Sequence, residues 1–137
     1  MDISTTTAVN LSTSYEQVKL LEHHNTDKAL EMYAELINQA QEAGDFVVQT
    51  DCLIRTSKLN KQRGAYYKAL HQGGTALQLI HMHNPGDSQR LAWVYKELGA
   101  IYADGFGKSS IALNYFFKGL KCNIPSLNIN FYNNIGS

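Results

Sequence analysis

Three segments of this 137-residue chain repeat one pattern of small and large residues. They read KALEMYAELI, KALHQGGTAL and IALNYFFKGL, and their alanines, Ala29, Ala69 and Ala112, lie 40 and 43 residues apart. A period of that length is typical of stacked helical hairpins, in which no unit buries its apolar face alone. Small residues let neighbouring helices approach closely and large ones fill the remaining space. The pattern therefore predicts an all-α fold.

Helix start and stop signals divide the chain into about seven helices joined by short turns. The stop and start signals are Gly44, Asp45, Gly64 and Asn84-Pro85-Gly86, and Thr26 is expected to cap the second helix. The predicted helices cover residues 14–24, 27–44, 46–63, 65–83, 88–103 and 108–122, with a seventh from Leu127. Residues 1–13 are expected to form a poorly ordered tail before one helical repeat domain over residues 14–137.

Composition excludes several classes of protein. Apolar residues make up 44% of the chain and charged residues 18%, which indicates a globular rather than a disordered protein. No apolar run is long enough for a transmembrane helix, and the polar start is not a secretory signal. Cys52 and Cys122 have no metal-type spacing and are interpreted as reduced thiols of a cytoplasmic protein. No metal or cofactor is expected.

The zero net charge hides an uneven distribution. Residues 1–51 carry a net charge of −7, residues 52–86 carry +5 and residues 87–137 carry +2. The molecule should therefore be a strong dipole. Five bases beside an acidic N-terminal third are too few for a nucleic-acid-binding face. A protein or peptide partner, acidic where it meets the basic segment, is expected instead.

The joint spacing of several residues resembles the tetratricopeptide repeat (TPR) family, in its longer-repeat form. The best-matching unit supplies Tyr95, Leu98-Gly99, Tyr102, Gly107, Ala112, Phe116 and Gly119-Leu120, with one extra residue between Tyr102 and Gly107. The preceding unit departs from the motif, because Asn60 replaces its tyrosine and Thr56-Ser57 replace Leu-Gly. The resemblance implies a right-handed superhelical array of hairpins, as found in the input or regulatory domains of bacterial signalling proteins.

The same resemblance implies that the first helix of each hairpin lines a concave groove. By register with Leu98-Gly99, the groove residues are Asp51, Ile54, Lys58, Lys61, Trp93, Lys96, Ala100 and Asn133. Lysines beside an aromatic ring suit an extended peptide that is acidic or ends in a carboxylate. The alternative is that these lysines form an ordinary solvated face.

The sequence favours a non-catalytic interaction module. An enzyme is the less favoured class, because the titratable residues converge on no helical face and no strand precedes the glycines of GFGK. His81 and His83 are two residues apart, whereas a helical metal pair needs a spacing of three or four. The alternative function is a homo-oligomerisation scaffold. The ending FYNNIGS lies inside an uncapped helix, so we expect a piece of a longer protein and a dimer.

Overall fold

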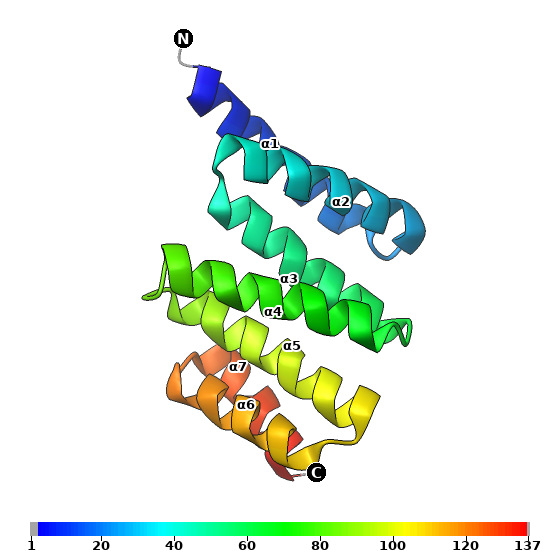
Figure 1. Cartoon of the computed structure of the whole chain (residues 1–137), viewed down its shortest axis with the longest axis vertical. Helices are drawn as coiled ribbons and strands as arrows, with labels where there is room; N and C mark the ends of the chain where they lie inside the picture. The colour runs from blue at the N-terminus through cyan, green and yellow to red at the C-terminus, as the bar shows by residue number, and fades with distance from the viewer. Residues whose placement is uncertain (1–2, 137) are drawn as a thin grey trace.

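The computed structural model describes residues 3–136, with side chains from residue 10 onward, and this part of the chain is entirely helical (Figure 1). The all-α prediction is therefore confirmed. The described helices are α1 (Ile3–Leu21), α2 (Thr26–Ala43), α3 (Phe46–Gln62), α4 (Tyr66–His83), α5 (Ser88–Phe106), α6 (Ser109–Lys121) and α7 (Pro125–Gly136).

Local capping sets most helix boundaries where the sequence predicts them. Gly44 ends α2 in the left-handed conformation at φ 71°, and its N–H donates to the carbonyls of Ala40 and Gln41. Asp45 then caps α3, because its carboxylate accepts a hydrogen bond of 3.1 Å from the N–H of Val48. The second helix differs in one detail. Its N-terminal cap is Asn25 and not Thr26, because the side chain of Asn25 accepts a hydrogen bond from the N–H of Lys28.

The first helix begins much earlier than the sequence predicts. α1 already covers residues 3–13, where a poorly ordered tail is expected, and residues 1–2 of that tail lie outside the described residues. Leu11, Tyr15 and Val18 form one buried stripe that belongs to the first core cluster. Serine and threonine have modest helix propensity, so the pattern of residues 3–13 alone does not indicate a helix. Packing of this stripe against α2 and α3 stabilises α1 from Leu11 onward.

The helices form two layers, which are defined by the helices that touch. α1 contacts α3, α3 contacts α5 and α5 contacts α7, so the odd-numbered helices form a continuous odd layer. α2, α4 and α6 form the even layer, and each packs between two odd helices. Within residues 3–136 the backbones of no two even-numbered helices come into close contact. Figure 1 shows the stack running along the long axis from α1 and α2 to α6 and α7.

The apolar core consists of three clusters in series along the stack. The first joins α1, α2 and α3, the second joins α3, α4 and α5, and the third joins α5, α6 and α7. Consecutive clusters share one odd-numbered helix. α3 is consequently enclosed by α1, α2, α4 and α5, and it is buried on nearly every side.

Glycine allows the closest contacts between helices at the C-terminal end of the stack. A Cβ atom added to Gly99 would clash with the ring of Phe116, and one added to Gly119 would clash with the ring of Phe131. These rings therefore lie directly on the backbone of the neighbouring helix. The small and large residues of the third repeat serve this packing, first within the hairpin of α5 and α6 and then between α6 and α7.

We predict that Gly99→Ala destabilises the protein, although alanine is the better helix former. The ring of Phe116 must move within a filled core, at a cost of about 1–3 kcal/mol in the free energy of unfolding. Gly74→Ala on α4 is the matched control, because an added Cβ there has no atom within 4 Å. It should gain about 1 kcal/mol from helix propensity. Urea unfolding followed by circular dichroism measures the change in the free energy of unfolding for both variants. Equal stabilisation by the two would contradict the close contact between Gly99 and the ring of Phe116.

Candidate functional site

Three ion pairs join elements of the odd layer, and each has one partner on α3. Glu22, just after α1, accepts hydrogen bonds of 2.8 and 2.7 Å from Arg55. Further along α3, Lys61 donates to Glu97 of α5 at 3.0 Å. Both carboxylates are almost fully buried, so each depends on its cation to offset the loss of water.

In the third pair α3 supplies the carboxylate rather than the cation. Asp51 of α3 accepts from Arg90 of α5 at 2.7 and 2.9 Å, in a two-point contact. Arg90 also donates to Asp87, the residue that caps α5, at 2.8 Å. Burial alone would raise the pKa of Asp87, but hydrogen bonds from Arg90 outweigh it and lower that pKa below its usual value. One guanidinium thus ties α3 to the beginning of α5.

Glu22 is the centre of a small network. The hydroxyl of Tyr33 on α2 donates to it beside Arg55, and Arg55 in turn lies over the ring of Trp93, 5.8 Å from its centroid. Burial alone would raise the pKa of Glu22, but hydrogen bonds from Arg55 and Tyr33 and the positive charge of Arg55 hold it below its ordinary value. The network joins elements of both layers around one carboxylate.

The structure distributes the predicted groove residues over several environments. Ile54 is 0% exposed and belongs to the second core cluster, so it has no surface for a partner. Asp51 and Lys61 are occupied by the ion pairs described above. The remaining predicted residues keep some exposed surface: Lys58, Trp93, Lys96, Ala100 and Asn133.

A hollow of about 340 Å³ lies between α3, α5 and α7. It brings together two of the predicted residues, Asp51 and Trp93, and its other lining residues are Gln89, Arg90, Ser126 and Leu127. The predicted lysines do not line it. Sequence reasoning missed Arg90, although Arg90 precedes Trp93 by three residues and therefore shares its helix face. It also missed Glu22, Tyr33 and Glu97, for which no short-range signal exists.

The described residues offer limited chemistry at this face. No group of three or more histidine, cysteine, aspartate or glutamate side chains in residues 10–136 is arranged to hold a metal ion. Both cysteines are free, and burial, with the negative charge of Asp51 adding to it, raises the pKa of the Cys52 thiol to about 12. That thiol is protonated at neutral pH. No helix in the described part is long and apolar enough to cross a membrane.

Comparison with known proteins adds no family to this description. The chain matches no protein-family model, no curated protein and no solved structure. A function must therefore be argued from the side chains and their arrangement.

We predict that Glu22→Gln lowers the free energy of unfolding at pH 7 by about 3 kcal/mol, because Arg55 loses its buried carboxylate partner. The folded-state pKa of Glu22 lies below its ordinary value of 4.5. Its contribution is therefore complete above that value and disappears as the pH falls through the folded-state pKa. The difference between the variant and the parent should shrink accordingly in acid, as measured by urea unfolding across a pH series.

Glu35→Gln provides the control for this experiment. Glu35 is exposed on α2 and forms no ion pair within the described residues, so its loss should change stability by less than about 0.5 kcal/mol. A Glu22 variant that matches this control at neutral pH would show that the pair contributes nothing.

Proposed function

We propose that the chain is a non-catalytic interaction module that binds an acidic peptide on its odd layer. The proposal includes a TPR-like superhelical arrangement of the hairpins. Two observations support that arrangement: over residues 3–136 the backbones of the odd-numbered helices contact one another in series and those of the even-numbered helices do not, and Gly99 receives the ring of Phe116 as the small-large repeat requires. An array of this kind exposes one long face made from a single layer of helices.

The observation that carries the proposal is the state of the cations on α3 and α5. Arg55, Lys61 and Arg90 are neutralised by carboxylates of the chain itself. Lys58 and Lys96 form no ion pair within the described residues, and both are half-buried. A half-buried ammonium group has lost part of its hydration and gains from a carboxylate that a partner supplies.

Trp93 gives this face an apolar anchor. It lies three residues before Lys96, so the two side chains share one face of α5. Its ring is half-buried and lies beside Arg55, which positions it at the surface between α3 and α5. A buried aromatic anchor surrounded by charges is the usual composition of a strong contact point in a protein interface. A peptide that presents an apolar side chain to Trp93 and carboxylates to the two lysines fits these groups.

The cellular role belongs to the same proposal and depends on the TPR resemblance alone. Arrays of this appearance are input or regulatory domains of bacterial signalling proteins, and fold-level analogy is the only basis for that step. We propose a cytoplasmic location because both cysteines are free, and one of them is buried.

We predict that Lys58→Glu/Lys96→Glu abolishes binding of acidic peptides selected from a displayed library. Loss of hydrogen bonds to charged groups, about 1.5–3 kcal/mol for each lysine, should raise the dissociation constant by about a hundredfold or more. Fluorescence anisotropy with the selected peptide measures the effect. Lys108→Glu/Lys121→Glu is the control, since both lysines are exposed on or beside α6 and the change in net charge is identical. Equal losses in the two double variants would reveal only a general charge effect.

Self-association is a second candidate function, and the surface of α7 favours it. Ile129 is 70% exposed and Tyr132 is 64% exposed on this terminal helix. Two apolar side chains three residues apart form one patch, which a second copy of the chain would cover.

If the patch forms a dimer, Ile129→Lys/Tyr132→Lys should convert it to a monomer in light scattering. The dimer of the parent protein should persist in high salt, because an apolar contact is not screened. A dimer that dissociates with salt would instead indicate contact between the acidic and basic parts of the chain. A parent protein that is monomeric at all concentrations would remove this candidate.

A further inference from the structure

The even layer contains two gaps that differ in their contents. Within the described residues the backbone of α4 makes no close contact with that of α2 or of α6, so α3 forms the floor of the first gap and α5 the floor of the second. We call them the α2/α4 gap and the α4/α6 gap. The two are related by the repeat, which makes each position of one comparable with a position of the other.

The packing confirms this register. Phe116 of α6 lies on Gly99 of α5, and the corresponding pair one unit earlier is Gly73 of α4 and Ser57 of α3, in which both residues are small and Leu98 of α5 also lies against Gly73. An added Cβ on Gly73 would lie 3.1 Å from the Ser57 hydroxyl oxygen. By this register, Asn60 corresponds to Tyr102, Gly64 to Phe106 and Gln72 to Tyr115.

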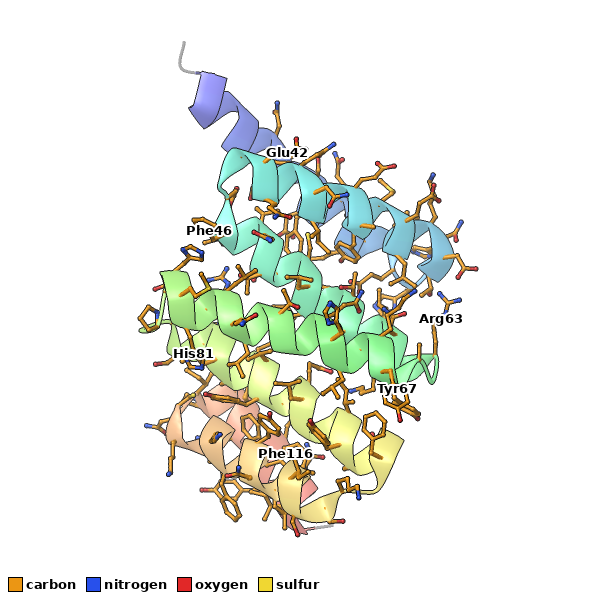
Figure 2. The ribbon with its side chains drawn as sticks, viewed as in Figure 1. Glu42, Phe46, Arg63, Tyr67, His81 and Phe116 are labelled. Carbon is orange, nitrogen blue, oxygen red and sulfur yellow. The ribbon has the colours of Figure 1, made fainter. Side chains whose placement is uncertain are left out.

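Aromatic rings fill the α4/α6 gap. Tyr102 of α5 stacks on Tyr115 of α6, with centroids 5.7 Å apart and planes 12° apart. Phe106 continues the row towards α4, where the ring of Tyr67 lies 5.0 Å away. The rings form a continuous bridge from α4 over the end of α5 to α6. Figure 2 shows Tyr67 at one end of this row.

The corresponding positions of the α2/α4 gap carry no ring. At the positions that correspond to the stacked Tyr102 and Tyr115, the amide of Asn60 donates a hydrogen bond of 2.7 Å to Gln72 Oε1. Where Tyr67 meets Phe106, Arg63 pairs with Asp27 at 2.8 Å. Asn60 and Gln72 replace two of the rings and Gly64 replaces Phe106 without any side chain, and the gap contains a hollow of about 620 Å³. Arg63, which is one of its lining residues, is labelled in Figure 2.

This hollow combines an apolar wall with a polar floor. Leu30, Ala34 and Ile37 of α2 form the wall, and Thr56 and Asn60 of α3 form the floor. The rest of the lining is more polar and includes two cations: Arg63, Ala65, Lys68 and Gln72. Its volume lies within the range of about 300–1,000 Å³ that is usual for ligand sites.

Two amide atoms of the hollow remain available. Asn60 is only 5% exposed, and within the described residues neither its Oδ1 nor Gln72 Nε2 forms a hydrogen bond. A ligand with an apolar ring and one hydroxyl group would satisfy both kinds of surface, because a phenol both donates and accepts a hydrogen bond.

We infer that the α2/α4 gap is a docking site for a tyrosine side chain of a partner polypeptide. The ring takes the place that Tyr102 fills in the α4/α6 gap. It packs on Leu30 and Ile37, and its hydroxyl group meets the amides of Asn60 and Gln72. The site lies in the even layer, so it is independent of the peptide face proposed on the odd layer. It gives the chain a second contact, with a preference for tyrosine.

The experiment titrates the 137-residue protein with N-acetyl-tyrosine amide and follows backbone amide signals by NMR. We expect saturable shifts confined to the hollow, with a dissociation constant on the order of 1 mM, as for other amino-acid-sized ligands. N-acetyl-leucine amide should bind about tenfold more weakly or not at all. N-acetyl-phenylalanine amide should be weaker than the tyrosine compound, because the two amides of the hollow stay unpaired.

Asn60→Tyr supplies the missing ring from the chain itself and should abolish the shifts without lowering the melting temperature. Asn114→Tyr, which adds a tyrosine at an exposed position of α6, should leave binding unchanged. Ala34→Arg changes only an exposed residue of the wall, so the protein should fold and bind more weakly even if Asn60→Tyr does not fold. The Lys58→Glu/Lys96→Glu protein should bind the tyrosine compound normally, which separates this test from that of the odd layer.

Several results would overturn the inference. Shifts that do not saturate or that scatter over all helices would show that there is no site. Equal affinity for the leucine compound would show a merely apolar groove. Shifts at the hollow that depend on protein concentration without any added compound would assign it to a second copy of the chain. Full binding by both Asn60→Tyr and Ala34→Arg would move the site elsewhere.

Discussion

The ion pairs of α3 are the interactions on which the arrangement of this protein depends. Glu22 and Glu97 are buried, and a buried carboxylate is tolerated only when a cation and hydrogen bonds replace its water. α3 supplies both cations, Arg55 and Lys61, and its own Asp51 receives Arg90. The residues that meet these groups lie just after α1 and on α5. The end of α1, α3 and α5 are thereby tied to one another, with α3 between the other two.

The character of both surfaces follows from that arrangement. In the odd layer, Arg55, Lys61 and Arg90 are held in internal pairs, whereas Lys58 and Lys96 form no ion pair within the described residues. In the even layer, the spacing set by the odd helices keeps α2, α4 and α6 apart. The gaps between them must be filled by side chains or stay open. Tyr102 and Phe106 fill one gap, whereas Asn60 and Gly64 leave the other hollow.

Helix positions could be predicted well because their signals are local. Asp45 caps α3 through a residue three positions away, and Gly44 ends α2 through its own backbone conformation. The extent of α1 could not be predicted in this way, since residues 3–13 have little helical preference. Its buried stripe becomes recognisable only when α2 and α3 are in place, because tertiary packing supplies most of the stability of such a helix.

The candidate site was less predictable from the sequence than the fold. The register identified Asp51 and Trp93, which do line one hollow, but it also selected Ile54, which is buried in the core. It counted Lys61 as an available charge, whereas Lys61 is paired with a residue 36 positions further along the chain. A repeat pattern specifies which helix face a residue occupies. It does not specify what the adjacent helix places opposite that residue.

The sequence by itself determined that this protein is a series of helices with a repeat of about 40 residues, because caps, glycine stops and small-large spacing act within one or two turns. Only the tertiary structure decided which charges are neutralised and which gap between helices is open. Those properties depend on side chains from three helices that meet across long separations in the chain. The pairing of Asp51 with Arg90 and the hollow beside Asn60 are therefore visible only after folding.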